Sequence, residues 1–214
     1  MDREKSPNRC NTEGDSASRL RESDVEVPAE MLDQIREGNA DMAQEAVRRL
    51  GPLVGRIVRR HLHRQDDAED LMQDVFLKMF QCLDQYRGEV PFSHWVGRIA
   101  LNTSLDRLRR HRVRPTVRWT ELEPTEQAVL EEVASDVQST RSGDFDGARA
   151  LFERLLESLD PKDAWILRRI ELEGASLAEA CAEAGWNATL TRVRLFRARG
   201  RLRRAFVELE EQKP

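Results

Sequence analysis

Apolar residues recur at intervals of three and four positions along most of the chain from residue 28 onward. This spacing places them on one face of an α-helix. In the first half the pattern predicts two helices separated by a break at Gly38-Asn39, a third over about Asp66–Leu83 and a fourth over about Phe92–Arg112. The Gly and Pro residues between the third and fourth helices, in Arg87–Pro91, predict a structured turn. We therefore expect an all-helical domain over residues 28–114.

A second helical domain is predicted over residues 148–209, with helices over Leu151–Ser158, Pro161–Glu171, Ser176–Ala184 and Ala188–Leu209. Residues 115–147 hold several Pro and Gly residues and mostly acidic charge, so they are expected to form a linker with one weak helix near Glu126–Val133. Residues 1–27 are polar and predict a disordered tail. The expected fold is all-α, with two small helical domains joined by an acidic linker.

Charge is distributed unevenly along the chain. The formal net charge is −4, yet residues 41–115 carry 14 basic and 10 acidic side chains, and residues 149–206 carry 12 and 8. Most of the basic residues in these two blocks are arginine, which binds phosphates and base edges in a bidentate manner. The sequence has no run of about 18 apolar residues and its first 21 residues lack the apolar centre of a signal peptide, so we expect a cytoplasmic protein. Three widely separated cysteines predict no disulfide, metal site or cofactor.

The clearest local motif lies in the second domain. Ser176-Leu177-Ala178-Glu179 has the pattern of a capping box that opens a short helix ending at Gly185, and Asn187 is placed to cap the next helix. A short helix, a turn with glycine and a longer Arg-rich helix predict a helix-turn-helix. Thr191, Leu195, Ala198 and Leu202 would pack inward, while the outward set is Thr189, Arg192, Val193, Phe196 and Arg197. That outward set suits phosphates, guanine edges and thymine methyls, and its alternative interpretation is an ordinary solvated helix.

Two further helix faces are candidate binding surfaces. On the fourth helix, Trp95, Arg98, Asn102 and Arg109 form one strip that suits unpaired bases, although Trp95 also fits an apolar core. On the third helix, an acidic face contains Asp67, Asp70, Gln73, Asp74 and Leu77. That face is open and contains a leucine, so it fits a docking surface or a solvated face better than a catalytic carboxylate pair.

Taken together and in this order, these stretches resemble the extracytoplasmic-function (ECF) sigma factors of the sigma-70 family. Asp67–Leu77 resembles region 2.2, Phe92–Arg112 resembles regions 2.3 and 2.4, and the helix-turn-helix resembles region 4. The resemblance implies that the region 2.2 face docks on the beta-prime clamp of core RNA polymerase. It also implies that region 2 melts and binds the minus-ten element through Arg87, Trp95, Arg98, Asn102, Arg109, Arg110 and Arg112.

Region 4 of the family reads the minus-thirty-five element and would also contact the beta flap of the polymerase. This chain departs from the family there, with Thr189-Leu190-Thr191 where Gly-Thr-Val is usual and Ala180-Cys181 where Ile-Ala is usual. The acidic linker resembles the segment that occupies the RNA-exit path, where acidic charge suits a basic channel. An anti-sigma factor is a further candidate partner.

The resulting hypothesis is a promoter-recognition factor that is not an enzyme. The first alternative is a stand-alone helix-turn-helix regulator, which leaves the acidic face and the Trp95 strip without a role. The second is a metal-dependent nuclease that uses the aspartate cluster, although no other motif brings further ligands to it. Co-purification with core polymerase, against metal-dependent activity, separates these hypotheses.

Overall fold

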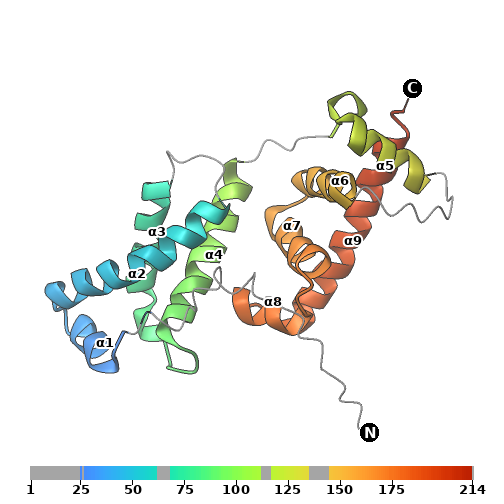
Figure 1. Ribbon diagram of the computed structural model, residues 1–214. Helices are drawn as coiled ribbons and strands as arrows, with labels where there is room; N and C mark the ends of the chain where they lie inside the picture. The colour runs from blue at the N-terminus through green and yellow to red at the C-terminus, as the bar shows by residue number, and fades with distance from the viewer. Residues whose placement is uncertain (1–24, 26, 62–67, 112–116, 135–144, 214) are drawn as a thin grey trace, which may run out of the picture.

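The computed structural model describes residues 25, 27–61, 68–111, 117–134 and 145–213, and every regular element in them is helical. The expected all-α fold is therefore confirmed. The first helices are α1 (Ala29–Arg36), α2 (Ala40–His61), α3 (Ala68–Gln81) and α4 (Phe92–His111), which we call the N-terminal bundle (Figure 1). Their bounds lie within a few residues of the predicted ones. The predicted break between α1 and α2 at Gly38-Asn39 is present and has a local cause. Gly38 has a positive φ of 90°, and the Asn39 side chain accepts hydrogen bonds from the first backbone amides of α2.

The core of the N-terminal bundle consists of the inward residues of α2, α3 and α4 together with Met31 and Leu32 of α1. Leu50, Val54, Leu71 and Val75 are completely buried there. Each such side chain stabilises the fold by roughly 1.5–3 kcal/mol relative to an exposed one. The short helix η3 (Leu83–Gln85) lies between the end of α3 and the predicted Arg87–Pro91 turn.

The other large group of elements is the C-terminal bundle. It contains α6 (Phe145–Glu157), α7 (Pro161–Leu167) with its π-helical continuation η5 (Arg168–Leu172), α8 (Leu177–Ala184) and α9 (Ala188–Glu210). The capping box is confirmed, because Ser176 Oγ accepts from Glu179 N and Glu179 Oε2 accepts from Ser176 N. Gly185 ends α8 at a φ of 67°, and Asn187 caps α9. The predicted packing stripe of α9 is also confirmed, since Thr191, Leu195 and Ala198 are buried and Leu202 is half-buried.

Part of the expected linker is folded. The short helix η4 (Trp119–Glu121) and α5 (Pro124–Ala134) pack on the C-terminal bundle, so the helix predicted near residues 126–133 is present. Leu122 and Leu130 lie in one apolar cluster with Leu155 and Leu209. The linker interpretation therefore needs correction for residues 117–134, because their scattered apolar side chains are numerous enough to bury together.

The two bundles pack against each other through α4, which lies beside α7 and α8 (Figure 1). Leu101 and Leu105 of α4 are buried in a cluster whose other members, such as Ile166 and Ala180, come from the C-terminal bundle. In the part of the chain that the structure describes, no helix is both long and apolar enough to span a membrane.

Candidate nucleic-acid and polymerase interfaces

The acidic face of α3 is open to solvent. Asp70, Gln73 and Leu77 are exposed and Asp74 is half-buried, and their spacing of three and four places them on one side of the helix. Leu77 is 59% exposed, whereas the neighbouring Val75 and Met79 are buried. We call Asp70, Gln73, Asp74 and Leu77 the docking face. Asp67, the fifth predicted member, lies outside the described residues.

The aromatic end of the α4 strip is a packing cluster. The rings of Tyr86, Phe92 and Trp95 have centroids 5.0–5.5 Å apart, and the Tyr86 hydroxyl donates a hydrogen bond to the Val90 carbonyl at 2.7 Å. Trp95 is half-buried, so it both supports the α3–α4 turn and keeps one part of its ring accessible. Arg87 in that turn is exposed.

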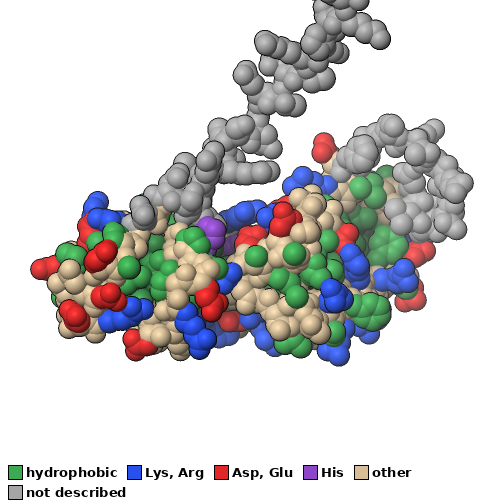
Figure 2. Space-filling model, turned by 90° about the horizontal axis from the view of Figure 1, so that it is seen from below, with side chains coloured by type: hydrophobic (Ala, Val, Ile, Leu, Met, Phe, Trp, Pro, Cys, Tyr) green, Lys and Arg blue, Asp and Glu red, His purple; other side chains and the backbone are tan. Residues whose placement is uncertain are grey.

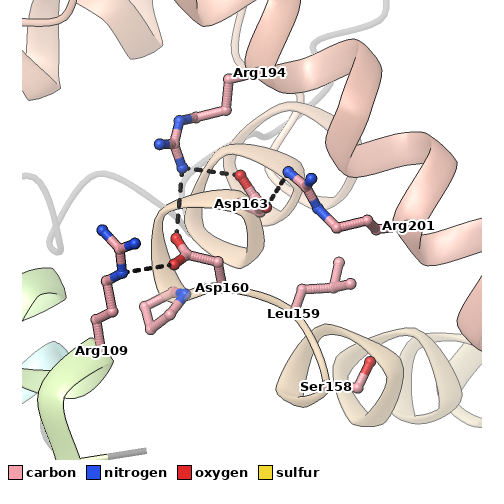
Figure 3. A pocket seen from close by; sticks show the side chains of 8 residues that line it. Arg109, Ser158, Leu159, Asp160, Asp163, Arg194 and Arg201 are labelled. Atoms are coloured by element: carbon pink, nitrogen blue, oxygen red, sulfur yellow. Dashed lines mark hydrogen bonds and ion pairs between the residues drawn. The ribbon is translucent and has the colours of Figure 1, made fainter. Parts of the chain in front are cut away.

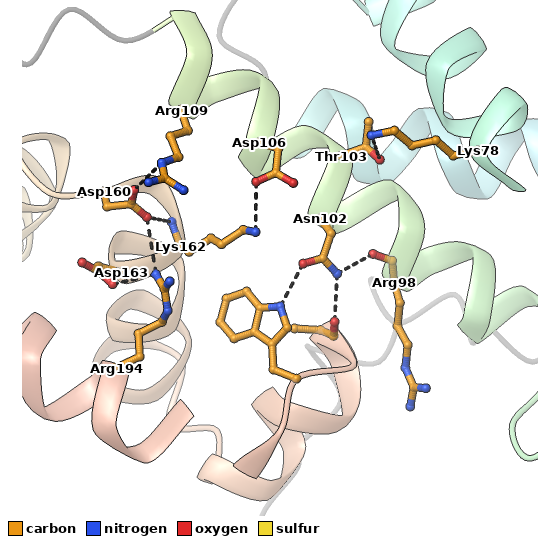
Figure 4. A network of polar contacts seen from close by, with 12 residues as sticks. Lys78, Arg98, Asn102, Thr103, Asp106, Arg109, Asp160, Lys162, Asp163 and Arg194 are labelled. Carbon is orange, nitrogen blue, oxygen red and sulfur yellow. Dashed lines mark hydrogen bonds and ion pairs between the residues drawn. The ribbon is translucent and has the colours of Figure 1, made fainter. Parts of the chain in front are cut away.

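The central residues of the strip contact the C-terminal bundle. Asn102 Nδ2 donates to the Ala184 carbonyl at 2.9 Å and to the Arg98 carbonyl at 2.8 Å, and Asn102 Oδ1 accepts from the indole N–H of Trp186 at 2.8 Å (Figure 4). Arg98 Nε donates to the Ala182 carbonyl at 2.9 Å. Two of the residues predicted to bind the minus-ten strand, Arg98 and Asn102, thus meet the end of α8.

Arg109 and Arg110 are exposed at the far end of α4, and Arg112 lies outside the described residues. Arg109 forms an ion pair with Asp160 at 3.3 Å, at the edge of a polar cavity of about 500 Å³ between α4, α7 and α9 (Figure 3). Arg194 and Arg201 also line the cavity, and both form ion pairs with the buried Asp163. These pairs join α9 to α7.

Sequence reasoning missed Asp163 and Trp186. Asp163 stands in an otherwise ordinary first turn of α7, and Trp186 stands in a turn between helices. Neither position carries a local signal, because their partners lie at least 31 residues away in the sequence.

All members of the predicted outward face of α9 are exposed: Thr189, Arg192, Val193, Phe196 and Arg197. Phe196 is 78% exposed, and Leu190, which was not predicted, is 71% exposed. We call the five predicted residues the α9 face. Its apolar groups and guanidinium groups point to solvent from a capped helix that follows a short helix and a glycine turn. This arrangement fits the major groove of duplex DNA.

Basic and acidic side chains are interspersed over both bundles on the face shown in Figure 2. They form no single basic patch on that face. His61, at the end of α2, lies where the bundles meet, near Arg168 and Glu173 of the C-terminal bundle. Burial, together with the charges of Arg60 and Arg168, lowers the pKa of His61 from 6.5 to about 4. The described residues contain no cluster of three or more His, Cys, Asp or Glu side chains able to hold a metal ion.

Comparison with known proteins identifies the family to which part of this sequence is similar. Residues 46–114, which include α3 and α4, match the family Sigma-70 region 2. The chain belongs to the sigma-70 family. It is similar to the ECF RNA polymerase sigma-E factor of Escherichia coli K12, with 28% identity over 79% of this chain and 88% of that protein. It is also similar to the RNA polymerase sigma-H factor of Pseudomonas aeruginosa, with 29% identity over 73% of this chain and 81% of that protein.

Two other similarities are to a further curated sigma factor and to one solved structure. The ECF RNA polymerase sigma factor SigM of Mycobacterium tuberculosis is 28% identical over 68% of this chain and 71% of that protein. The structure of CnrH in complex with the cytosolic domain of CnrY is similar over 80% of this chain and 92% of that chain, with 26% identity and a TM-score of 0.41. This sigma factor is of the ECF type, directs transcription initiation and is not an enzyme.

Proposed function

We propose that this sigma factor divides initiation among three surfaces. The docking face of α3 binds the beta-prime clamp of core polymerase, α4 and the Arg87–Pro91 turn hold the unpaired minus-ten strand, and the α9 face reads the minus-thirty-five element. The observation that carries the proposal is the exposure of the α9 face and the docking face, on separate helices, in the same chain. A stand-alone duplex-DNA regulator would use the α9 face and would have no use for the docking face.

The docking face is suited to a basic protein partner. Its carboxylates project from one side of a helix, and Leu77, three positions after Asp74, offers an apolar contact beside them. Charged groups at the rim steer association, and a buried apolar side chain at the centre contributes most of the affinity. Contact of the C-terminal bundle with the beta flap is proposed on the family resemblance alone. An anti-sigma factor is a candidate partner on the same basis. Because the polymerase is the proposed partner, we place the protein in the cytoplasm.

The α9 face combines two modes of contact with duplex DNA. Arg192 and Arg197 have the cationic groups that bind phosphates and guanine edges. Val193 and Phe196 are apolar and exposed, and such groups contact the methyl of thymine. Binding here would position the complex before the strands separate.

Strand opening would then depend on α4. Melting costs free energy, and polar contacts and stacking to the displaced bases offset that cost. The Asn102 amide reads polar base edges, Arg98 and Arg109 supply positive charge, and the exposed part of Trp95 offers a stacking surface. The polymerase carries out the chemistry.

Charge reversal on the docking face tests the assignment to core polymerase. Asp70→Lys combined with Asp74→Lys should weaken binding of purified core polymerase at least about tenfold, because like charges then face the partner. Glu37→Lys combined with Asp41→Lys makes the same change in net charge on exposed residues where α1 meets α2, outside the docking face and the C-terminal bundle, and should leave binding unchanged. Equal affinity of the two variants, measured by fluorescence anisotropy with helix content checked by circular dichroism, would remove the docking face from the proposal.

A further inference from the structure

We propose that the C-terminal bundle closes over α4 in the free protein, and that Trp186 occupies the position on Asn102 that an unpaired base takes in the open promoter complex. The inference rests on the proposed role of α4 in strand capture. It adds an autoinhibitory contact within the chain: the minus-ten surface is occupied by the sigma factor itself until the bundles separate.

The hydrogen-bonding capacity of Asn102 carries the first step. A side-chain amide has two N–H donors and one carbonyl acceptor. Both donors are used, by the Ala184 and Arg98 carbonyls, and the acceptor receives the Trp186 indole N–H (Figure 4). An indole is a planar aromatic group with a ring N–H, and in this contact it resembles a nucleobase that presents its edge. A base can gain these contacts on Asn102 only by displacing Trp186 and the end of α8.

Apolar packing holds the indole in place. Trp186 contacts Trp165 edge to face, with ring centroids 5.1 Å apart, and the Arg194 guanidinium lies over the indole at 5.8 Å. Leu101 and Leu105 of α4 are 3% and 2% exposed, and they are buried against the same group of C-terminal residues. Separation of the bundles would expose these leucines, so closure is favourable in water.

Ion pairs also join α2 and α4 to the C-terminal bundle. Asp106 pairs with Lys162 at 2.9 Å, Arg109 with Asp160 at 3.3 Å, and Arg60 with Glu173 at 3.0 Å. At least one partner of each pair is well exposed, so each pair stabilises the contact only weakly. The closed state is thus held by a small apolar contact and weak polar ones, and such an interface within one chain can open.

The closed state leaves the polymerase contact available. The docking face lies on α3 and is exposed while α4 is covered. A partner that binds the open form more tightly shifts the population toward it. Core polymerase would therefore dock first, and separation of the bundles would follow as α9 engages duplex DNA and α4 is freed for the strand.

The test uses the full chain in two measurements. Dyes on Glu37→Cys and Gln212→Cys, in a chain whose three native cysteines are replaced by alanine, report the distance between the bundles by energy transfer without DNA. Anisotropy reports binding of a single-stranded oligonucleotide that carries the non-template minus-ten sequence of a promoter mapped by in vitro transcription. Trp186→Phe keeps an aromatic ring and removes the N–H donor. Trp119→Phe, an indole away from α4, is the matched control.

We expect Trp186→Phe to lower the energy transfer and to tighten oligonucleotide binding about three- to tenfold, because apparent affinity follows the open fraction and one hydrogen bond is lost. The control should change neither value. A charge exchange guards against simple misfolding: Lys162→Asp should open the chain, and adding Asp106→Lys should close it again. Unchanged energy transfer in Trp186→Phe would overturn the closed state and leave the proposed function intact. Lower energy transfer with unchanged oligonucleotide binding would overturn the proposal that Trp186 occupies the position of a base on Asn102. It would also count against strand capture by α4.

Discussion

Replacing Asp163 by alanine should destabilise the C-terminal bundle by about 2 kcal/mol. Asp163 is 1% exposed and accepts hydrogen bonds from Arg194 and from Arg201, which joins α7 to α9 (Figure 3). Removing one partner of a fully buried ion pair costs about 3–5 kcal/mol because a charge is left buried and unpaired. Here the two arginine side chains are 36% and 40% exposed, so water can hydrate them after the change. The expected loss is therefore about 2 kcal/mol, below the range for a fully buried pair.

Urea unfolding followed by circular dichroism measures this loss. Glu171→Ala is the matched control, because Glu171 also pairs with an arginine of α9, Arg199, but both side chains are exposed. That pair should contribute less than about 1 kcal/mol. Asp163→Asn keeps the shape and one acceptor, so its loss should lie between the two. If Asp163→Ala and Glu171→Ala cost the same, the buried carboxylate does not hold α9 on α7.

Two other predictions follow from the structure. Because the pKa of His61 is about 4 in the fold and 6.5 in the unfolded chain, stability is fully present above about pH 6.5 and falls toward pH 4, by at most about 3 kcal/mol. Urea unfolding at several pH values should show this slope, and His61→Gln should flatten it; an equal slope in both proteins would refute the assignment. The short connection between His111 and Val117 reaches at most about 20 Å, so we expect α5 to leave the C-terminal bundle when both promoter elements are bound. Hydrogen exchange of the Leu130 amide should then become faster in the promoter complex, and unchanged protection would contradict this.

The elements that the sequence predicted well are those with local causes. The capping box of Ser176 and Glu179, the left-handed Gly185 and the apolar stripe of α9 depend on residues within a few positions of one another. The exposure of the docking face and of the α9 face also follows from helical periodicity, which sorts side chains into buried and open sides.

The features that the sequence did not predict depend on contacts between distant segments. Asn102 is polar and stands on the face expected to meet nucleic acid, but its partner Trp186 lies 84 positions away. Asp163 looks like a solvated carboxylate until α9 brings two arginines to it. The segment 117–134 looks like a linker because its apolar residues are scattered among acidic ones, and only the surface of α6 and α9 makes a core of them.

Transcription from matched and pre-opened templates tests the division of labour between α4 and α9 most directly. With core polymerase and a duplex promoter, Asn102→Ala and Arg197→Ala should both lower the yield of specific transcript. A template already mismatched over the minus-ten element should restore much of the activity of Asn102→Ala, because the cost of melting is removed. It should help Arg197→Ala less, since that residue is assigned to the upstream duplex contact. Equal rescue of both variants, or of neither, would contradict the account.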